Sequence, residues 1–199
     1  MSPVPGSDST RPTGPHVRLT YDDFVHFPDD GMRHELIDGE HYVTPAPSWK
    51  HQTVIGNIHS HIWNYLKQHP VGRVCMAPFD VVFSSFDVVE PDVLFVSSAR
   101  LPEVLTAKNL QGAPDLVVEV ASPGTRRRDE QIKRELYQRA GVSEYWLVDP
   151  EADAVTIYRM VEGRYGPPEE LTADRNESLT TPLLPGLELP LAAVFEDTD

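Results

Sequence analysis

The sequence predicts an α/β fold built around a mixed β-sheet. Runs rich in β-branched residues alternate with segments whose apolar residues recur at helical spacing. One strand–helix–strand unit, residues 115–149, has the length of a crossover connection between two parallel strands. With 199 residues, 40% of them hydrophobic, and no internal repeat, the chain can bury the core of one domain.

Capping and turn residues mark the elements of the first third of the chain. Thr20, followed three residues later by Asp23, predicts the capped start of a short helix. The segment HELIDGEHYV predicts a hairpin, because Asp38-Gly39 is a favoured two-residue turn. Ser48 then begins a long amphipathic helix.

The sequence also predicts how the chain is divided and which elements follow the long helix. Residues 1–18, rich in Pro, Ser, Thr and Gly, predict a disordered leader. Residues 19–160 form the predicted core, and residues 161–199 extend the same domain with one or two edge strands. The elements predicted after the long helix are strands over 74–83 and 91–97 with a turn at 84–87, a strand over 115–122, a helix over 126–140 that stops at Gly141, and strands over 144–150 and 154–161.

The charge of the chain limits the kinds of partner that it can bind. A net charge of −14 argues against broad, non-specific nucleic-acid binding, which usually requires a basic surface. Residues 151–199 carry eleven acidic and three basic residues, whereas residues 126–139 hold six arginines and lysines. A local basic patch is therefore expected within an acidic protein, although a solvated helix face explains the same residues equally well.

Three features bear on the setting and assembly of the protein. The single cysteine, Cys75, excludes an internal disulfide and favours a reduced, cytoplasmic environment. No run of 18 apolar residues is present, so no membrane-spanning helix is expected. A homodimer is expected on general grounds.

A carboxylate lies in the middle of the most strand-like segment, DLVVEVAS. Side chains alternate along a strand, so Glu119 shares one face with Val117 and Ala121. An unpaired buried charge costs several kcal/mol, so a cation, a metal ion or solvent must face it. Asp92 begins the strand PDVLFV, and two carboxylates on neighbouring strands suit Mg²⁺. A cap at Asp92 and an arginine partner for Glu119 explain both residues without a metal.

Longer segments resemble a known family. The succession HELIDGE, PDVLFV, PDLVVEVASPGTRRRDEQIKRELYQRAGVSEYWLVDP and VTIYR is similar to the Uma-two family of restriction-endonuclease-like proteins, over about residues 19–159. That family is placed in the PD-(D/E)XK nuclease superfamily. The resemblance implies a restriction-endonuclease-like mixed β-sheet core flanked by helices. It also implies a phosphodiesterase site that uses Mg²⁺ or Mn²⁺.

The resemblance further implies a set of site residues. Asp92 and Glu119 match the two acidic residues of the superfamily motif. Glu35 of HELIDGE matches the family's extra acidic residue near the start of the fold, which would hold a second metal or a metal-bound water. The lysine that usually stands two residues after the glutamate is replaced by Ala121, and the family pattern points to Lys133 on the following helix. Supporting roles are implied for Glu35, His51, Ser122 and Asp129, and nucleic-acid contacts are expected from Arg126, Arg127 and Arg128.

The expected function is metal-dependent hydrolysis of DNA phosphodiester bonds. One alternative is a catalytically weak or inactive module that binds nucleic acid or protein on the same fold, which the acidic balance and Ala121 favour. Another is hydrolysis of a small phosphate ester. Structural roles also stay open, because Ser122 can end the strand, Asp129 can stabilise the first helical turn and His51 can begin its helix.

Overall fold

Residues 17–197, the part of the chain that the computed structural model describes, contain two large β-sheets, one separate pair of short strands and the helices that cover the sheets. The larger sheet has seven strands and is mixed, because β8 and β9 run parallel while the other neighbouring strands are antiparallel. Its strands in spatial order are β11 (Arg164–Tyr165), β10 (Ala154–Val161), β9 (Glu144–Asp149), β8 (Leu116–Val120), β6 (Val93–Ser97) and β3 (Gly72–Met76), with β12 (Glu169–Thr172) also paired to β10.

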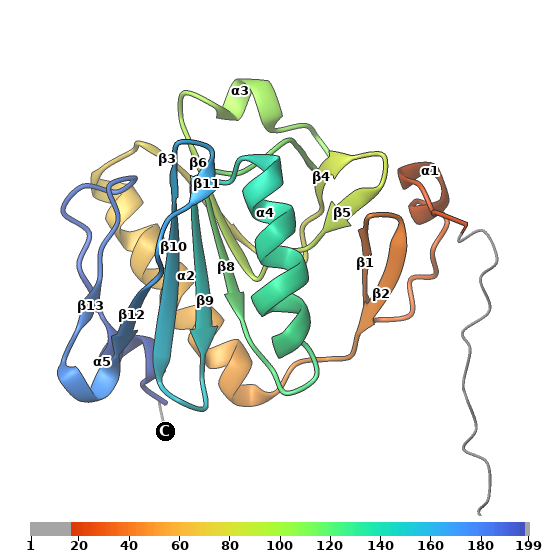
Figure 1. The fold of residues 1–199 in the computed structure, drawn as a ribbon. Coiled ribbons are helices and arrows are strands. Elements are labelled where there is room, and N and C mark those ends of the chain that lie inside the picture. Colours follow the sequence, from red (N-terminus) through yellow and green to blue (C-terminus); the bar gives the residue numbers. More distant parts are fainter. Residues whose placement is uncertain (1–16, 198–199) are drawn as a thin grey trace, which may run out of the picture.

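The smaller sheet lies beside the larger one and contains the predicted hairpin (Figure 1). The hairpin turn has the expected backbone, since Asp38 and Gly39 have φ angles of 54° and 77°. The strands of this sheet in spatial order are β2 (Glu40–Thr44), β1 (Arg33–Ile37), β5 (Asp87–Val89), β4 (Val81–Ser84) and β7 (Leu110–Gln111), and a separate pair joins β13 (Ser178–Leu179) to β14 (Leu189–Pro190).

Helices cover both faces of the larger sheet (Figure 1). The long helix α2 (Trp49–Gln68) begins at Ser48, whose Oγ accepts the backbone N–H of His51 at 3.3 Å. Helical conformation over 126–140 consists mainly of a π-helical turn and α4, and it stops at Gly141 with φ 85°. The remaining helices are α1 (Tyr21–Phe24), α3 (Leu101–Val104), the π-helical turn (Arg128–Lys133), α4 (Arg134–Ala140), a 3₁₀ turn (Ala173–Arg175) and α5 (Leu191–Phe195).

The strand β8 separates two apolar clusters. Leu116, Val118 and Val120 pack on the side of α2 and α5, whereas Val117 and Ala121 pack on the side of α4. The alternation predicted from the sequence is therefore confirmed. The crossover from β8 through α4 to the parallel strand β9 is confirmed as well.

Two predictions about strands were wrong. The run 74–83 is divided between β3 and β4, which belong to different sheets, because Pro78 has no amide hydrogen and interrupts the strand. The tail after residue 161 forms four short strands instead of one or two, and its apolar residues complete the core on the side of α2.

The expected leader, residues 1–18, lies outside the described residues except for its last two. Within residues 17–197, no helix has the length and apolar character that a membrane crossing requires.

Candidate active site

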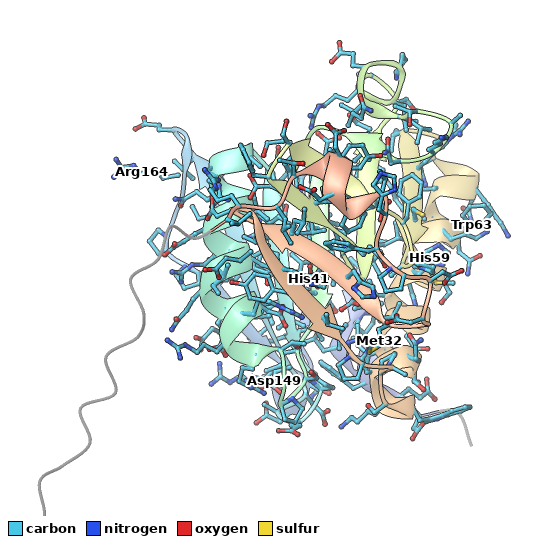
Figure 2. All side chains as sticks on the ribbon, turned by 90° about the vertical axis from the view of Figure 1, so that its right-hand side faces the viewer. Met32, His41, His59, Trp63, Asp149 and Arg164 are labelled. Atoms are coloured by element: carbon cyan, nitrogen blue, oxygen red, sulfur yellow. The ribbon has the colours of Figure 1, made fainter. Side chains whose placement is uncertain are left out.

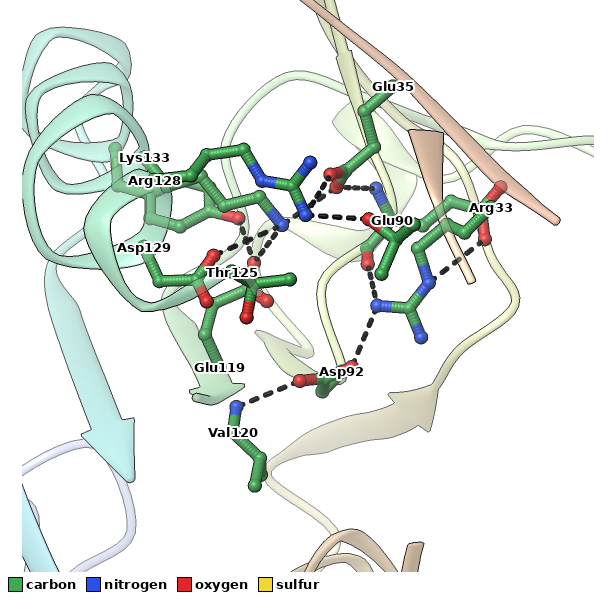
Figure 3. Close-up of polar contacts among 12 residues, drawn as sticks. Arg33, Glu35, Glu90, Asp92, Glu119, Val120, Thr125, Arg128, Asp129 and Lys133 are labelled. Carbon is green, nitrogen blue, oxygen red and sulfur yellow. Dashed lines mark hydrogen bonds and ion pairs between the residues drawn. The ribbon is translucent and has the colours of Figure 1, made fainter. Parts of the chain in front are cut away.

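The predicted acidic residues and the helix lysine meet where the two sheets face α4 (Figure 3). Glu35 lies on β1, Glu119 lies on β8 and Lys133 ends the π-helical turn, while Asp92 directly precedes β6. All four side chains are buried. The structure thus brings together residues that are up to 98 positions apart in the sequence.

Lys133 is the centre of this cluster. Its Nζ lies 2.7 Å from Glu35 Oε1 and 2.9 Å from Glu119 Oε1, and it lies 4.0 Å from Asp129 Oδ1. Tyr137, one turn later, donates its hydroxyl hydrogen to the same oxygen of Glu119. The carboxylate in the middle of β8 is therefore compensated by a buried ammonium group.

The π-helical turn explains how several charged side chains point inward from one short segment. In a π-helix the hydrogen bonds run from residue i to residue i+5, so residues four or five apart share a face. Asp129 stands four positions and Arg128 five positions before Lys133, and all three side chains face the cluster. Such turns occur often at functional sites.

Strand register brings Asp92 next to Glu119. The strands β6 and β8 pair antiparallel with Val93 opposite Val118, so the next position on each strand is Asp92 and Glu119. Asp92 Oδ1 accepts a hydrogen bond from Arg33 at 2.8 Å. Its Oδ2 accepts a hydrogen bond from the backbone N–H of Val120 at 2.8 Å and lies 3.4 Å from His51 Nε2. The other ring nitrogen of His51, Nδ1, has no hydrogen-bond partner among the described residues.

The two central carboxyl groups have opposite pKa shifts. Burial would raise the pKa of Asp92, but the hydrogen bond with His51 and the charge of Arg33 outweigh it and lower the pKa to about 2. Burial raises the pKa of Glu119 to about 8, even though Lys133 opposes this change. Asp92 is thus held ionised, whereas Glu119 binds a proton readily in the absence of another cation.

The predicted supporting residues hold the turn between β8 and the helix. The backbone N–H of Ser122 donates to Thr125 Oγ1 at 3.1 Å, and the two hydroxyl oxygens lie 3.0 Å apart. The backbone N–H of Asp129 donates to the carbonyl of Thr125 at 3.0 Å. The Asp129 carboxyl is buried, which raises its pKa.

The three arginines of this turn point in different directions. Arg126 pairs with Asp149 at 2.7 Å on the surface, and Arg127 is exposed. Arg128 turns inward, where it donates to Thr44 Oγ1 at 2.6 Å and lies 3.7 Å from Glu35 Oε2. The structure therefore does not gather the expected nucleic-acid contacts into one surface.

Arg33 and Glu90 belong to the cluster but were missed in the sequence. Arg33 Nε lies 3.8 Å from Glu90 Oε2, and the backbone N–H of Glu90 donates to Glu35 Oε1 at 3.1 Å. Burial raises the pKa of Glu90 to about 7 against the opposing charge of Arg33. Strand alternation was the available signal for Arg33, because Arg33 and Glu35 are two positions apart on β1.

Comparisons with known proteins identify the family of the chain. Residues 21–192 match the Uma2 family, which is described as "Putative restriction endonuclease". The chain belongs to this family. A crystal structure of a "putative nuclease" from Anabaena variabilis aligns with a TM-score of 0.75 and 21% identity, over 89% of this chain and 97% of that one. No curated protein matches the chain.

Family membership and the mixed α/β fold predicted from the sequence are thereby confirmed. The aligned crystal structure has a similar overall fold, and at 21% identity the similarity bears on the fold alone.

The cluster has the donor chemistry for a hard divalent cation. Five carboxyl groups face three arginine and lysine side chains and one histidine, His51, and Glu35 Oε2 is buried without a hydrogen-bond partner among the described residues. Mg²⁺ prefers oxygen ligands and needs only one or two carboxylates. Within residues 17–197, however, no three His, Cys, Asp or Glu side chains are already grouped to hold a metal ion. The acidic groups of the cluster are Glu35, Glu90, Asp92, Glu119 and Asp129, and the arginines and lysine are Arg33, Arg128 and Lys133.

Proposed function

We propose that this Uma2 protein is a divalent-metal-dependent endonuclease that hydrolyses phosphodiester bonds of DNA. The position of Lys133 carries the proposal. Its ammonium group lies 2.9 Å from Glu119 Oε1, although the strand position where the superfamily motif has a lysine is Ala121. In this proposal, the lysine from the helix supplies the positive charge that the superfamily motif takes from the strand.

Asp92 and Glu119 would hold Mg²⁺ or Mn²⁺, with Glu35 as a further ligand through Oε2, which accepts no hydrogen bond from a described residue and lies 3.7 Å from Arg128. The metal would polarise the phosphodiester and lower the pKa of a bound water. Lys133 would stabilise negative charge that develops on the phosphate, because its ammonium group is fixed within a buried cluster. His51 would orient Asp92 by facing its Oδ2.

The DNA backbone would be contacted from the turn after β8. Arg127 is exposed, and Arg126 can exchange its surface partner Asp149 for a phosphate. Arg128 would contribute only after leaving Glu35, while Ser122 and the buried Asp129 keep the turn in shape. A symmetric dimer and a cytoplasmic setting belong to the same proposal.

A binding module without catalysis is the second candidate. It is favoured by the absence, among the described residues, of a ready group of three metal ligands, and by the ion pairs that the central carboxylates make. In that case the cluster is a structural ion network. A calorimetric titration with Mn²⁺ separates the two candidates, because only the endonuclease requires metal binding that Glu119→Gln abolishes.

The decisive experiment is a nicking time course on supercoiled plasmid with Mg²⁺ or Mn²⁺. Wild type is compared with Asp92→Asn, Glu119→Gln and Lys133→Arg, which keep the size or the charge of the original side chain. Lys50→Arg is the matched control, because Lys50 is an exposed lysine that pairs with Asp153. Circular dichroism establishes that each variant is folded.

Metal-dependent nicking that is lost in the three site variants and kept in Lys50→Arg supports the endonuclease. Nicking that persists in Glu119→Gln and Asp92→Asn indicates a contaminating nuclease. If the wild type cleaves neither plasmid nor single-stranded DNA but hydrolyses a generic phosphodiester, the proposed substrate class is wrong, but the proposed active site is supported.

A further inference from the structure

The larger sheet ends in an edge that is open in the described part of the chain. The strand β3 pairs with β6 on one side, and no described strand pairs with its other side. Soluble proteins usually protect such an edge with proline, bulges or several charges. The sequence of β3, GRVCM, has no proline and a single charge at Arg73, and its pairing with β6 has no bulge.

The helix α2, which packs on the face of the sheet next to this edge, carries no acidic residue. The chain has 31 Asp and Glu residues and a net charge of −14, yet none of them lies among the 20 residues of α2. One side of α2 packs against α5 and its underside packs against β3 and β6. The opposite flank carries His59, Trp63 and Lys67, with His59 stacked on the Trp63 ring and Lys67 Nζ 5.7 Å from it.

Apolar side chains are exposed along the same border. Trp63 is 49% exposed, Val71 in the following turn is 42% exposed and Met76 at the end of β3 is 46% exposed. Figure 2 shows Trp63 and His59 on one side of the molecule, projecting from α2. Tryptophan and methionine are enriched at protein interfaces, where acidic residues are depleted.

We propose that a second copy of this chain docks here, with the two β3 strands paired antiparallel about a two-fold axis. A two-fold axis between identical strands produces the antiparallel arrangement, in which the outward N–H and C=O groups of each β3 satisfy those of the other. The flanks of the two α2 helices then meet above the joined sheet and bury Trp63. Two copies with a charge of −14 each can approach along this flank because it lacks carboxylates.

Sedimentation equilibrium tests the proposal without reference to enzyme activity. The wild type is expected to have twice the mass of one chain at high concentration. Trp63→Glu places two carboxylates near the axis and is expected to weaken the dimer by about 100-fold or more. Trp49→Glu is the matched control, because Trp49 is 77% exposed at the other end of the same helix, and it is expected to leave the dimer unchanged.

Hydrogen exchange gives an independent measurement. The β3 amides that face away from β6 are expected to exchange more slowly in wild type at high concentration than in Trp63→Glu. A wild type that stays monomeric overturns the proposal. A dimer that survives Trp63→Glu, or whose outward β3 amides exchange as in the monomer, overturns it too and shifts the interface to another surface.

Discussion

The two faces of β8 are stabilised in different ways although they belong to one strand. On the side of α2, Leu116, Val118 and Val120 enter a cluster of apolar residues. On the side of α4, Glu119 stands between Val117 and Ala121 and faces a network of ions. The backbone and its register are the same for both faces.

This difference separates two kinds of buried surface. The apolar face gains free energy in proportion to the area removed from water, and it depends little on pH. The ionic face is stable only while each charge has a partner, because a lone buried charge is strongly unfavourable. An ionic network with more carboxylates than basic groups is therefore stable as a metal site or a proton-binding site.

The largest expected effect tests this contrast directly. Lys133→Met leaves Glu35 and Glu119 facing each other, and it is expected to lower the free energy of unfolding by about 3–5 kcal/mol at pH 8. Val118→Ala on the other face is expected to lower it by about 2 kcal/mol. Urea denaturation at pH 8 and pH 5.5 measures both changes.

The pH dependence distinguishes the two variants. The loss in Lys133→Met should be smaller at pH 5.5 than at pH 8. Burial raises the pKa of Glu119 to about 8 even with Lys133 present, so at pH 5.5 Glu119 is protonated in the wild type and the ammonium group has less charge to compensate. The loss in Val118→Ala should be the same at both pH values. Equal pH dependence in the two variants would contradict an ionic origin.

Asp92 is expected to have the next largest effect, and its pKa shift is opposite in sign to that of Glu119. Arg33 and His51 keep the pKa of Asp92 near 2, below its ordinary 3.8, against the effect of burial. The ionised group therefore adds stability above about pH 4, and this stability is lost as the pH falls toward 2. Asp92→Asn should lower the free energy of unfolding by about 2 kcal/mol at pH 7 and by much less at pH 2.5, as measured by urea denaturation.

Glu90 is expected to change stability with pH in the sense opposite to Asp92. Burial raises its pKa from 4.5 to about 7, so the folded state binds the proton more tightly and stability falls as the pH rises from 4.5 to 7. Glu90→Gln should raise the free energy of unfolding by about 1–2 kcal/mol at pH 8, after allowance for partial solvent screening, and leave it unchanged at pH 4. The exposed Glu103→Gln is the control. A destabilised Glu90→Gln at pH 8 would show that the carboxylate is needed in its charged form.

The smallest effect on stability is expected outside the buried cluster. Arg126→Ala removes a partly exposed ion pair with Asp149 and should change the free energy of unfolding by about 0.5 kcal/mol or less. If the turn contacts DNA, the same variant should reduce the slope of log affinity against log salt by about 1. Fluorescence anisotropy with labelled DNA measures this slope, and an unchanged slope would remove Arg126 from the interface.

Much of the local structure could be predicted from the sequence. The cap at Thr20, the turn at Asp38-Gly39 and the stop at Gly141 depend on a few neighbouring residues, so their signals are complete within the local sequence. The alternation that places Glu119 on one face of β8 is also local. The division of residues 74–83 between two sheets is not, because it depends on which distant strands β3 and β4 join.

The sequence by itself determined which carboxylate lies in the middle of a buried strand and which lysine follows it on a helix. Only the tertiary structure decided that Lys133 contacts Glu119, that Arg33 holds Asp92 and that Arg128 turns away from the surface. Ion pairs form between elements that meet after the chain has folded, and their geometry depends on strand register and on the π-helical turn. The energy of a buried charge is set by partners within a few ångströms, and sequence spacing does not encode distances of that kind.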